Sequence, residues 1–494
     1  MDINLTAPNG KNISFSTGLF INNQFVKGSS SESLASIDPA TEDPICSVEV
    51  ATDADVDTAV QAARAAFDNP AWRDLTPEQR AALLHKAADL IEAHKEDLFT
   101  LQALDVGKPF PASMHFEAPH TAGCLRYYAG WADKLHGQTV PVSKDKFGYT
   151  LRQPVGVCGA ITPGTSRSPP RPWKLGPALA TGNCVIMKPS EYTPLSALYL
   201  AKLFAEAGYP PGVVQVLNGH GRSTGEALVN HPGVDKIAFT GSVATGQRIL
   251  KLAAGQMKRT TIEAGGKSAF LVFADADLEQ AAKWAISGGF GNAGQICSAN
   301  SRILVQRAVQ QQFLDIFSRM ARASKVGMPF DASTTQGPQA SKMQYNKIMG
   351  YIESANQDGA ELVMGGGRYQ DLGDKGYFVQ PTIYKGVTRD MKIFHEEIFG
   401  PVLAVTAFET EDEAVALAND SAYGLAAMVF TENIKVAHRT AARLQSGMVY
   451  INESNNVDWK LPFRGSKQSG LGSELGESGL DAYLEEKVIH LNLG

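Results

Sequence analysis

From residue 156 onward, short runs rich in β-branched residues alternate with stretches of helical periodicity. This alternation is what most constrains the fold, because parallel strands need crossover connections, and these are usually helices that cover both faces of the sheet. The first series predicts strands at 157–162, 185–188, 213–217 and 236–239, separated by helices that include 194–206 and 245–254. The pattern predicts a doubly wound parallel sheet of the α/β class.

A second series of the same kind begins at residue 269. It predicts strands at 269–273, 302–306, 426–431 and 448–452, and helices at 278–287, 310–322 and 435–444. Residues 138–154 instead predict an extended hairpin inserted before the first parallel strand. At 494 residues the chain exceeds one ordinary hydrophobic core. We therefore expect two α/β domains, each with a doubly wound parallel sheet, and a small β appendage.

Two helix starts carry capping signals. Thr76, followed by Pro77 and Gln79, is typical of a capping box with proline at the first helical position, and the amphipathic stretch behind it extends to about Leu104. Thr193 is the expected cap of the helix at 194–206.

The composition excludes several classes of function. Basic and acidic residues are interspersed and the formal net charge is −6, which is not typical of a nucleic-acid-binding protein. No apolar run approaches the ~18 residues of a membrane span, and the N-terminus lacks the features of a signal peptide. The five cysteines are scattered and show no metal-ligand spacing, so we expect reduced thiols, no metal site and a cytoplasmic protein.

Cys297 lies in a glycine-rich run, FGNAGQICS, just over thirty residues after the glutamate of EAGGK, Glu263. A thiolate is a good nucleophile for a carbonyl carbon, and a carboxylate can activate the water that releases the acyl group. This pair predicts carbonyl chemistry through a covalent thioester. The alternative is that Cys297 is a buried structural cysteine.

Two further segments indicate a nucleotide site. The turn Gly241–Gly246, which includes Ser242, joins a strand to a helix start and offers free N–H groups to a pyrophosphate, although it lacks the G-x-G-x-x-G pattern. Lys188 and Glu191 follow a predicted strand, where doubly wound sheets bind ligands, and the charge of Glu191 favours NAD over NADP. A turn that binds nothing and a solvated Lys/Glu pair are the alternatives.

These residues together resemble the aldehyde dehydrogenase superfamily over nearly the whole chain. The matching segments, in order, are 174–183 (KLGPALATGN), 188–191 (KPSE), 239–242 (FTGS), 263–268 (EAGGKS), 294–297 (GQIC), 396–401 (EEIFGP) and 469–474 (SGLGSE).

The resemblance implies roles for individual residues. Cys297 would be the nucleophile and Glu263 the base that hydrolyses the thioester to a free carboxylic acid. The residues that would bind NAD are Lys188, Glu191, Gly241, Ser242, Gly246, Glu397 and Phe399. Glu474 matches a proton-relay position, but Ser473 replaces the usual Arg before it, so we expect Glu474 on the surface.

The resemblance also implies an organisation. An NAD-binding domain would comprise 1–137 and 157–264, a catalytic domain 265–470, and an oligomerisation arm 138–156 and 480–494. Homodimers or homotetramers would follow. Trp173 matches an aromatic position of the substrate tunnel, with plain packing as the alternative, and Asn455, Asn456 and Trp459 would lie near the tunnel mouth. The identity of the aldehyde does not follow from the sequence.

One segment departs from the family. After 161–163 the family reads Trp-Asn-Phe-Pro-Leu, whose Asn amide helps to bind the oxyanion, whereas this chain reads GTSRS and places Thr165 at that position. Loss of one such donor costs about 2.7–4 kcal/mol in the barrier. The codons TGG AAC TTC CCG CTC, followed by C and read one base later, encode GTSRS. We hypothesise compensating frame errors across 164–172, in the determined sequence or in the gene, and we expect the four prolines at 163, 169, 170 and 172 to disfavour helix there.

Two functions of different classes remain. The first is an NAD-dependent oxidation of an aldehyde to a carboxylic acid. The second is a catalytically impaired NAD-binding scaffold, because Thr165 would weaken turnover. Reduction of acids is a weaker third option, because attack of water on a thioester is effectively irreversible in water.

Overall fold

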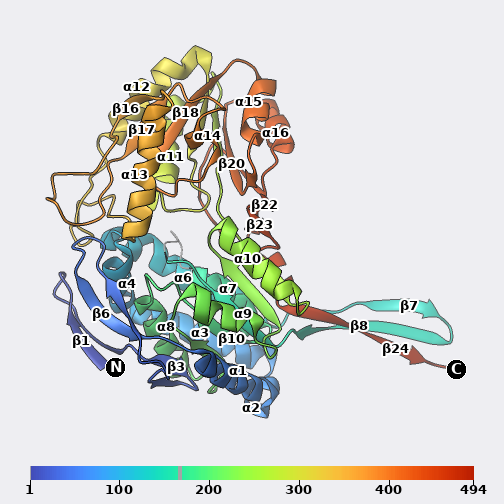
Figure 1. The fold of residues 1–494 in the computed structure, drawn as a ribbon. Coiled ribbons are helices and arrows are strands. Elements are labelled where there is room, and N and C mark those ends of the chain that lie inside the picture. The colour runs from blue at the N-terminus through green and yellow to red at the C-terminus, as the bar shows by residue number, and fades with distance from the viewer. Residues whose placement is uncertain (1, 165–169) are drawn as a thin grey trace.

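The computed structural model describes residues 2–164 and 170–494. Two α/β bodies lie one above the other, and a narrow β arm projects from the side of the first body (Figure 1). Both termini belong to the first body and its arm (Figure 1). Two α/β bodies with a β appendage were expected from the two strand–helix series.

Within the described residues, the first body holds a sheet of eight strands in the order β23-β13-β12-β9-β10-β11-β3-β4. The parallel strands are β9 (Val157–Ile161), β10 (Cys184–Lys188), β11 (Val214–Val216), β12 (Lys236–Thr240) and β13 (Arg259–Glu263). The antiparallel edges are β3 (Leu19–Ile21), β4 (Gln24–Val26) and β23 (Gly470–Leu471). The four predicted parallel strands of this series are confirmed, whereas the antiparallel edges carry too few residues to give a pattern.

The strand order of this sheet reverses next to β9. The chain runs from β9 to β10 and β11 on one side, and it then returns through β12 and β13 on the other. Ligands of doubly wound sheets bind at the carboxyl ends of the strands that flank such a reversal. The segments that follow β10 and β12 are those that the sequence singled out.

The helices of the first body are α1 (Asp53–Asp68), α2 (Pro70–Arg73), α3 (Pro77–Ala93), α4 (Lys95–Val106), α5 (Phe110–Ala112), α6 (Ala118–Ala129), α7 (Pro170–Ala180), α8 (Leu195–Ala207), α9 (Glu226–Asn230) and α10 (Val243–Ala254). The capping box at Thr76 and Gln79 is present. The single helix expected to reach Leu104 is two helices, because His94 leaves helical geometry with φ −103° and ψ 16°.

Two expectations about helix starts were wrong. Helix α8 is capped from a distance: the N–H of Leu195 donates to Oδ2 of Asp105 at 3.0 Å, and Pro194 rather than Thr193 is the N-cap residue. The prolines at 170 and 172 were expected to disfavour helix, yet helix α7 begins at Pro170; residues 165–169 of the same segment lie outside the described residues. Proline fits the first turn of a helix, where its missing N–H would have no intrahelical partner.

The second sheet has the order β16-β17-β18-β15-β14-β20-β21 among the described strands. Its strands are β14 (Ala269–Val272), β15 (Arg302–Gln306), β16 (Glu361–Met364), β17 (Thr382–Lys385), β18 (Val402–Phe408), β20 (Ala426–Phe430) and β21 (Met448–Ile451). Its helices are α11 (Leu278–Phe290), α12 (Gln310–Ala321), α13 (Lys342–Gln357), α14 (Lys392–His395), α15 (Glu411–Asn419) and α16 (Ile434–Arg443). The expected elements of the second series are present, whereas β16–β18 and α13–α15 were not anticipated.

Alternate residues of β14 pack into different cores. Leu271 belongs to one apolar cluster, whereas Phe270 and Val272 belong to another. Side chains of a strand point alternately to the two faces of its sheet, so both faces of this sheet are covered.

The arm is a three-stranded antiparallel sheet of β7 (Thr139–Ser143), β8 (Lys146–Pro154) and β24 (Leu484–Asn492). The hairpin expected at 138–154 is confirmed, and the C-terminal strand adds to it along its full length. Figure 1 shows the arm projecting away from both bodies. Its apolar side chains Val140, Val142, Leu151, Val488 and Leu491 are exposed.

Two-stranded ribbons complete the described fold. They are β1 (Asp2–Thr6) with β2 (Asn12–Ser16), β5 (Ser33–Ile37) with β6 (Pro44–Glu49), and β19 (Tyr423–Gly424) with β22 (Ser466–Lys467). A short helix, α17 (Ser478–Asp481), precedes the last strand.

Candidate active site

Cys297 lies in a tight loop after α11 and is partly exposed. The loop contains three successive left-handed residues, Asn292, Ala293 and Gly294, with φ of 51°, 55° and 71°. A Cβ at Gly294 would lie 2.1 Å from the carbonyl oxygen of Gly400, so only glycine fits there. Close packing against a neighbouring loop therefore fixes the position of the thiol.

Glu263 ends strand β13 and is buried. Neither of its carboxylate oxygens has a hydrogen-bond partner among the described residues. Burial, followed by the negative charge of Glu474, raises the pKa of Glu263 well above its ordinary value, and the positive charge of Lys174 opposes the shift. Burial therefore favours the protonated form of the Glu263 carboxyl group.

The thiol of Cys297 interacts electrostatically with the carboxyl groups of Glu263 and Glu397. Burial raises the pKa of Cys297 to about 12, and the negative charges of Glu263 and Glu397 add to the increase. The structure thus brings both carboxyl groups within electrostatic range of the thiol. A thiol that is mostly withdrawn from water and lies beside two carboxylates stays protonated until positive charge or a base arrives.

A cavity of about 160 Å³ lies over the thiol. Its lining residues are Phe116, Glu117, His120, Trp173, Ile296, Cys297, Ser298, Asn455, Asn456, Val457 and Phe463. Glu263 is not part of this wall. The cavity therefore exposes the thiol to a small molecule, while the carboxyl group of Glu263 lies outside the cavity wall.

The expected tunnel residues lie at this cavity. Trp173, Asn455 and Asn456 line it, and the ring of Trp459 packs edge-on against His120 with centroids 5.2 Å apart. His120 and Phe116 were missed by the sequence analysis. Phe116 lies within a π-helical turn at Ser113–Glu117, and His120 lies on α6, which follows that turn directly. Such turns are rare in proteins.

Glu474 is not a surface residue, which corrects the expectation from the sequence. Only 3% of its surface is exposed, and its carboxylate pairs with the buried ammonium of Lys174. Lys174 also donates to Oγ1 of Thr240 at 2.8 Å. This pair lies close enough to Glu263 to shift its pKa.

Lys188 and Glu191 lie at the carboxyl end of β10. Only 2% of the surface of Lys188 is exposed, and its ammonium donates to the carbonyl of Pro189 at 3.0 Å and to Oε2 of Glu191 at 3.5 Å. Burial lowers the pKa of Lys188, whereas the charge of Glu191 opposes this shift. An ammonium has three donors, so this arrangement leaves one for a ligand hydroxyl.

The turn after β12 starts helix α10. Oγ of Ser242 accepts from the N–H of Thr245, so Ser242 is the N-cap residue. A Cβ at Gly241 would lie 2.4 Å from Cζ of Phe239. Gly246 is buried, and a Cβ there would lie 3.0 Å from Cγ2 of Ile262, so this glycine sets the distance between helix and sheet.

Glu397 and Phe399 lie in the loop that contacts the Cys297 loop. The N–H of Gly266 donates to Oε1 of Glu397 at 3.1 Å, and burial raises the pKa of Glu397 to about 7. Phe399 has a left-handed backbone with φ 57°, and its carbonyl accepts from Nε2 of Gln344 at 2.9 Å. Backbone strain at a bulky residue persists only where the surroundings impose it.

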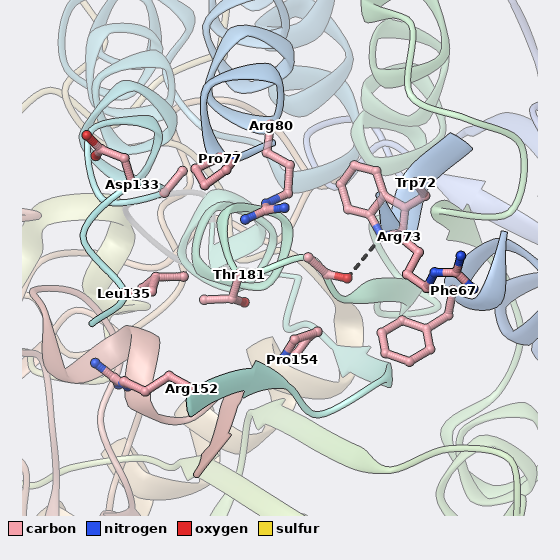
Figure 2. Close-up of a pocket in the computed structure, with 12 residues that line it drawn as sticks. Phe67, Trp72, Arg73, Pro77, Arg80, Asp133, Leu135, Arg152, Pro154 and Thr181 are labelled. Carbon is pink, nitrogen blue, oxygen red and sulfur yellow. Dashed lines mark hydrogen bonds between the residues drawn. The ribbon is translucent and has the colours of Figure 1, made fainter. Parts of the chain in front are cut away.

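A larger cavity, of about 260 Å³, lies at the base of the arm. Figure 2 shows Arg80, Arg152 and Thr181 around it. The guanidinium of Arg80 donates to the carbonyls of Ala180 and Leu75 at 3.1 and 2.7 Å, and that of Arg152 pairs with Asp481. These charged groups are already bonded within the chain, so we assign no ligand to this cavity.

Thr165, on which the expected weakening of the oxyanion site depends, lies outside the described residues. In the described ranges, no cluster of three or more His, Cys, Asp or Glu side chains is arranged to hold a metal ion. In the same ranges, no helix is both long and apolar enough to cross a membrane.

Comparisons with known proteins agree with this geometry. The model of the aldehyde dehydrogenase family matches residues 25–489. An aldehyde dehydrogenase of Alternaria alternata is 48% identical over 100% of this chain and 98% of its own length, and a mitochondrial aldehyde dehydrogenase of Mesocricetus auratus is 46% identical over 99% and 97%. The NAD⁺ complex of a Bacillus cereus aldehyde dehydrogenase superposes with a TM-score of 0.95, at 45% identity over 97% of each chain. The chain therefore belongs to the aldehyde dehydrogenase family, a family of oxidoreductases.

Proposed function

We propose that this protein oxidises an aldehyde to a carboxylic acid with NAD, through a thiohemiacetal and a thioester on Cys297. The observation that carries the proposal is the partly exposed thiol in the wall of a cavity, with the buried carboxyl groups of Glu263 and Glu397 within electrostatic range. A nucleophile, a base and a substrate space are the parts that acyl chemistry through sulfur requires.

The residues at the sheet reversal fit a dinucleotide. Lys188 and Glu191 would hold the ribose of the adenosine half, and the turn Gly241–Gly246 with Ser242 would face the pyrophosphate, because helix N-termini bind anions. Glu397 and Phe399 would hold the nicotinamide ribose and ring. When bound, NAD accepts a hydride. The NAD⁺ complex of the Bacillus cereus relative supports this choice of cofactor.

The chemistry of the chain begins with the thiol. Loss of its proton makes Sγ of Cys297 a nucleophile, and attack on the aldehyde carbon forms a tetrahedral thiohemiacetal whose oxygen carries the negative charge. Reformation of the carbonyl expels the hydride from that carbon and leaves a thioester on Sγ. Glu263 then takes a proton from water, the hydroxide attacks the thioester, and the carboxylic acid leaves as Sγ regains its electron pair.

Glu263 must return its proton to solvent after each turnover. The neighbouring ion pair of Lys174 and Glu474 is buried and acts on the pKa of Glu263. We infer that this pair stabilises the charge changes at Glu263 while the proton leaves. The negative charge of Glu474 favours the neutral form of Glu263, whereas the positive charge of Lys174 favours its ionised form.

We propose the same division of the chain that the sequence suggested. The NAD-binding domain would comprise 1–137 and 157–264, the catalytic domain 265–470, and the oligomerisation arm 138–156 and 480–494. Exposed apolar side chains on the arm support a role in a homodimer or homotetramer. A cytoplasmic location remains our prediction, and because the Mesocricetus auratus relative is named mitochondrial, fractionation of cells is its test.

Purified protein mixed with NAD and a panel of aldehydes tests the function. We expect NADH and the matching acid. Cys297→Ser should abolish both, whereas Glu263→Gln should leave a burst of NADH and slow the steady state about 10²-fold or more, since general bases contribute this much. Cys46→Ser is the matched control, because burial also raises the pKa of Cys46 to about 12. Full turnover by Cys297→Ser would refute the mechanism.

The second candidate is an impaired scaffold that binds NAD without turnover, because of Thr165. Binding of NAD, absence of NADH formation and absence of acylated Cys297 would support it. Sequencing of genomic DNA and transcript across codons 160–175 tests the origin of the segment, and agreement of both with the present frame would eliminate an error in the determined sequence.

A further inference from the structure

His120 brings an unexpected polar group to the cavity that holds Cys297. It lies on α6, is partly exposed and lines that cavity. Nε1 of Trp173 donates a hydrogen bond to its Nε2 at 3.2 Å. An imidazole nitrogen that accepts carries no proton, so the neutral ring of His120 has its proton on Nδ1, a tautomer assigned from this hydrogen bond.

The His120 ring stays neutral at physiological pH. Burial lowers the pKa of His120 to about 4, and the carboxylate of Asp458 opposes this only in part. The ring therefore presents an N–H donor without a full charge.

Four other polar side chains of the wall make hydrogen bonds within the chain, and one of them is Asn456, whose Nδ2 donates to Oε2 of Glu453 at 3.1 Å. Ser298 donates to Oδ1 of Asn455, and Nδ2 of Asn455 donates to the carbonyl of Gly288 at 3.3 Å. Glu117 accepts from Lys108 at 2.9 Å and 3.1 Å. For Nδ1 of His120, by contrast, the described residues supply no hydrogen-bond partner. This N–H is therefore a donor that remains for the substrate.

The rings around His120 define the shape of the molecule that fits. The ring centroids of Trp173 and Phe463 lie 5.0 Å apart, and the ring of Trp459 packs edge-on against His120. Aromatic side chains bind flat rings by offset stacking and edge contacts. A cationic substrate is disfavoured, because the carboxylate of Glu117 in the cavity wall is already paired with the ammonium of Lys108.

We propose that His120 determines substrate specificity, by donating from Nδ1 to an oxygen on the ring of an uncharged aromatic aldehyde. This inference deepens the proposed oxidation and rests on it. The oxygen-bearing end of the aldehyde would contact His120 while the carbonyl carbon lies at Sγ of Cys297.

Binding to a protein that cannot turn over separates this inference from the proposed function. Titration calorimetry on Cys297→Ala would compare 3-methoxybenzaldehyde with 3-ethylbenzaldehyde, which have nearly the same shape and differ in the acceptor oxygen. We expect His120→Phe to weaken binding of the methoxy compound about fivefold, the value of one hydrogen bond, and to leave the ethyl compound within about twofold.

Three further variants keep the test decisive. His120→Asn retains a donor near the position of Nδ1 and should keep the preference, whereas His120→Gln should lose it. Trp459→Phe, which leaves His120 unchanged, should weaken both compounds equally. An unchanged methoxy-to-ethyl ratio in both His120→Phe and His120→Gln would overturn the inference, as would failure of Cys297→Ala to bind either compound.

Steady-state kinetics distinguish the inference about His120 from the proposed oxidation on which it rests. In one outcome the protein oxidises aliphatic aldehydes while His120→Phe leaves the ratio of kcat/KM for the two aromatic compounds unchanged. That result would contradict the inference about His120 and would be consistent with the proposed oxidation. A binding preference that depends on His120, without formation of NADH from any aldehyde, would refute the proposed oxidation instead.

Discussion

The backbone N–H of Gly266 donates to Oε1 of Glu397 at 3.1 Å, across 131 residues of sequence. The same glycine contacts the nucleophile loop, because a Cβ at Gly266 would lie 2.7 Å from the carbonyl oxygen of Cys297. One glycine segment therefore sets the distance between the candidate nicotinamide-ribose ligand and the candidate nucleophile. Any side chain in this segment must displace one of them.

Gly265→Ala should disrupt this spacing. Its Cβ would lie 2.1 Å from Oε2 of Glu397, which is closer than atoms approach without moving. We expect kcat/KM for NAD to fall about 10²-fold, because a displacement of about 1 Å costs that much in an active site. Steady-state kinetics measure this. Gly350→Ala on α13 is the control, since nothing lies within 4 Å of the added Cβ, and equal activity of the two variants would contradict the prediction.

Glu397→Gln should make the thiol of Cys297 more reactive. The charge of Glu397 raises the pKa of Cys297, so its removal lowers that pKa and increases the thiolate fraction, about tenfold for each pKa unit. Iodoacetamide should therefore alkylate Cys297 faster at pH 8, as followed by mass spectrometry of the peptide. Glu432 is exposed, so Glu432→Gln should leave the rate of alkylation unchanged. A slower alkylation in Glu397→Gln would contradict the prediction that the charge of Glu397 raises the pKa of Cys297.

Glu263→Gln should stabilise the protein, increasingly so as the pH rises. The folded state raises the pKa of Glu263, so its contribution to stability is complete below the unfolded pKa and is lost as the pH rises through the folded pKa. Glutamine avoids this loss. Thermal unfolding at pH 5 and pH 9 should give a difference in Tm between variant and parent that is larger at pH 9. A difference that does not change with pH would be inconsistent with a buried, protonated carboxyl group.

Lys174→Met should destabilise the fold by about 3–5 kcal/mol, because it leaves the carboxylate of Glu474 buried without its partner. The double variant Lys174→Met, Glu474→Leu should recover much of the loss, since an apolar pair avoids the desolvation of both charges. Chemical denaturation measures both free energies. Strictly additive effects would indicate that the two side chains do not interact.

Charges on the arm should break the assembly. Val140→Lys with Val488→Lys would place two cations among the exposed apolar side chains of β7 and β24. We expect the mass in solution, measured by light scattering, to fall towards that of the monomer. Lys487→Glu, on the same strand, serves as a control for charge alone. An unchanged mass would exclude these side chains from the interface.

The sequence determined the local elements, and it predicts the chemistry of the thiol. β-branched runs and helical periods indicate strands and helices because both periodicities are local, and the predicted strands β9, β10, β12 and β14 are present. The capping box at Thr76 is local for the same reason. Cys297 and Glu263 stay the predicted nucleophile and base, because their residue types and glycine-rich surroundings fit carbonyl chemistry.

Tertiary structure decided everything that depends on contacts between distant segments. Lys174 and Glu474 are 300 residues apart, so no local pattern shows that Glu474 is buried in an ion pair rather than exposed. His120 likewise reaches the cavity of Cys297 only through the packing of α6 beside Trp173. Burial and charge pairing arise from the folded arrangement of the chain, whereas periodicity and residue type are properties of the sequence itself.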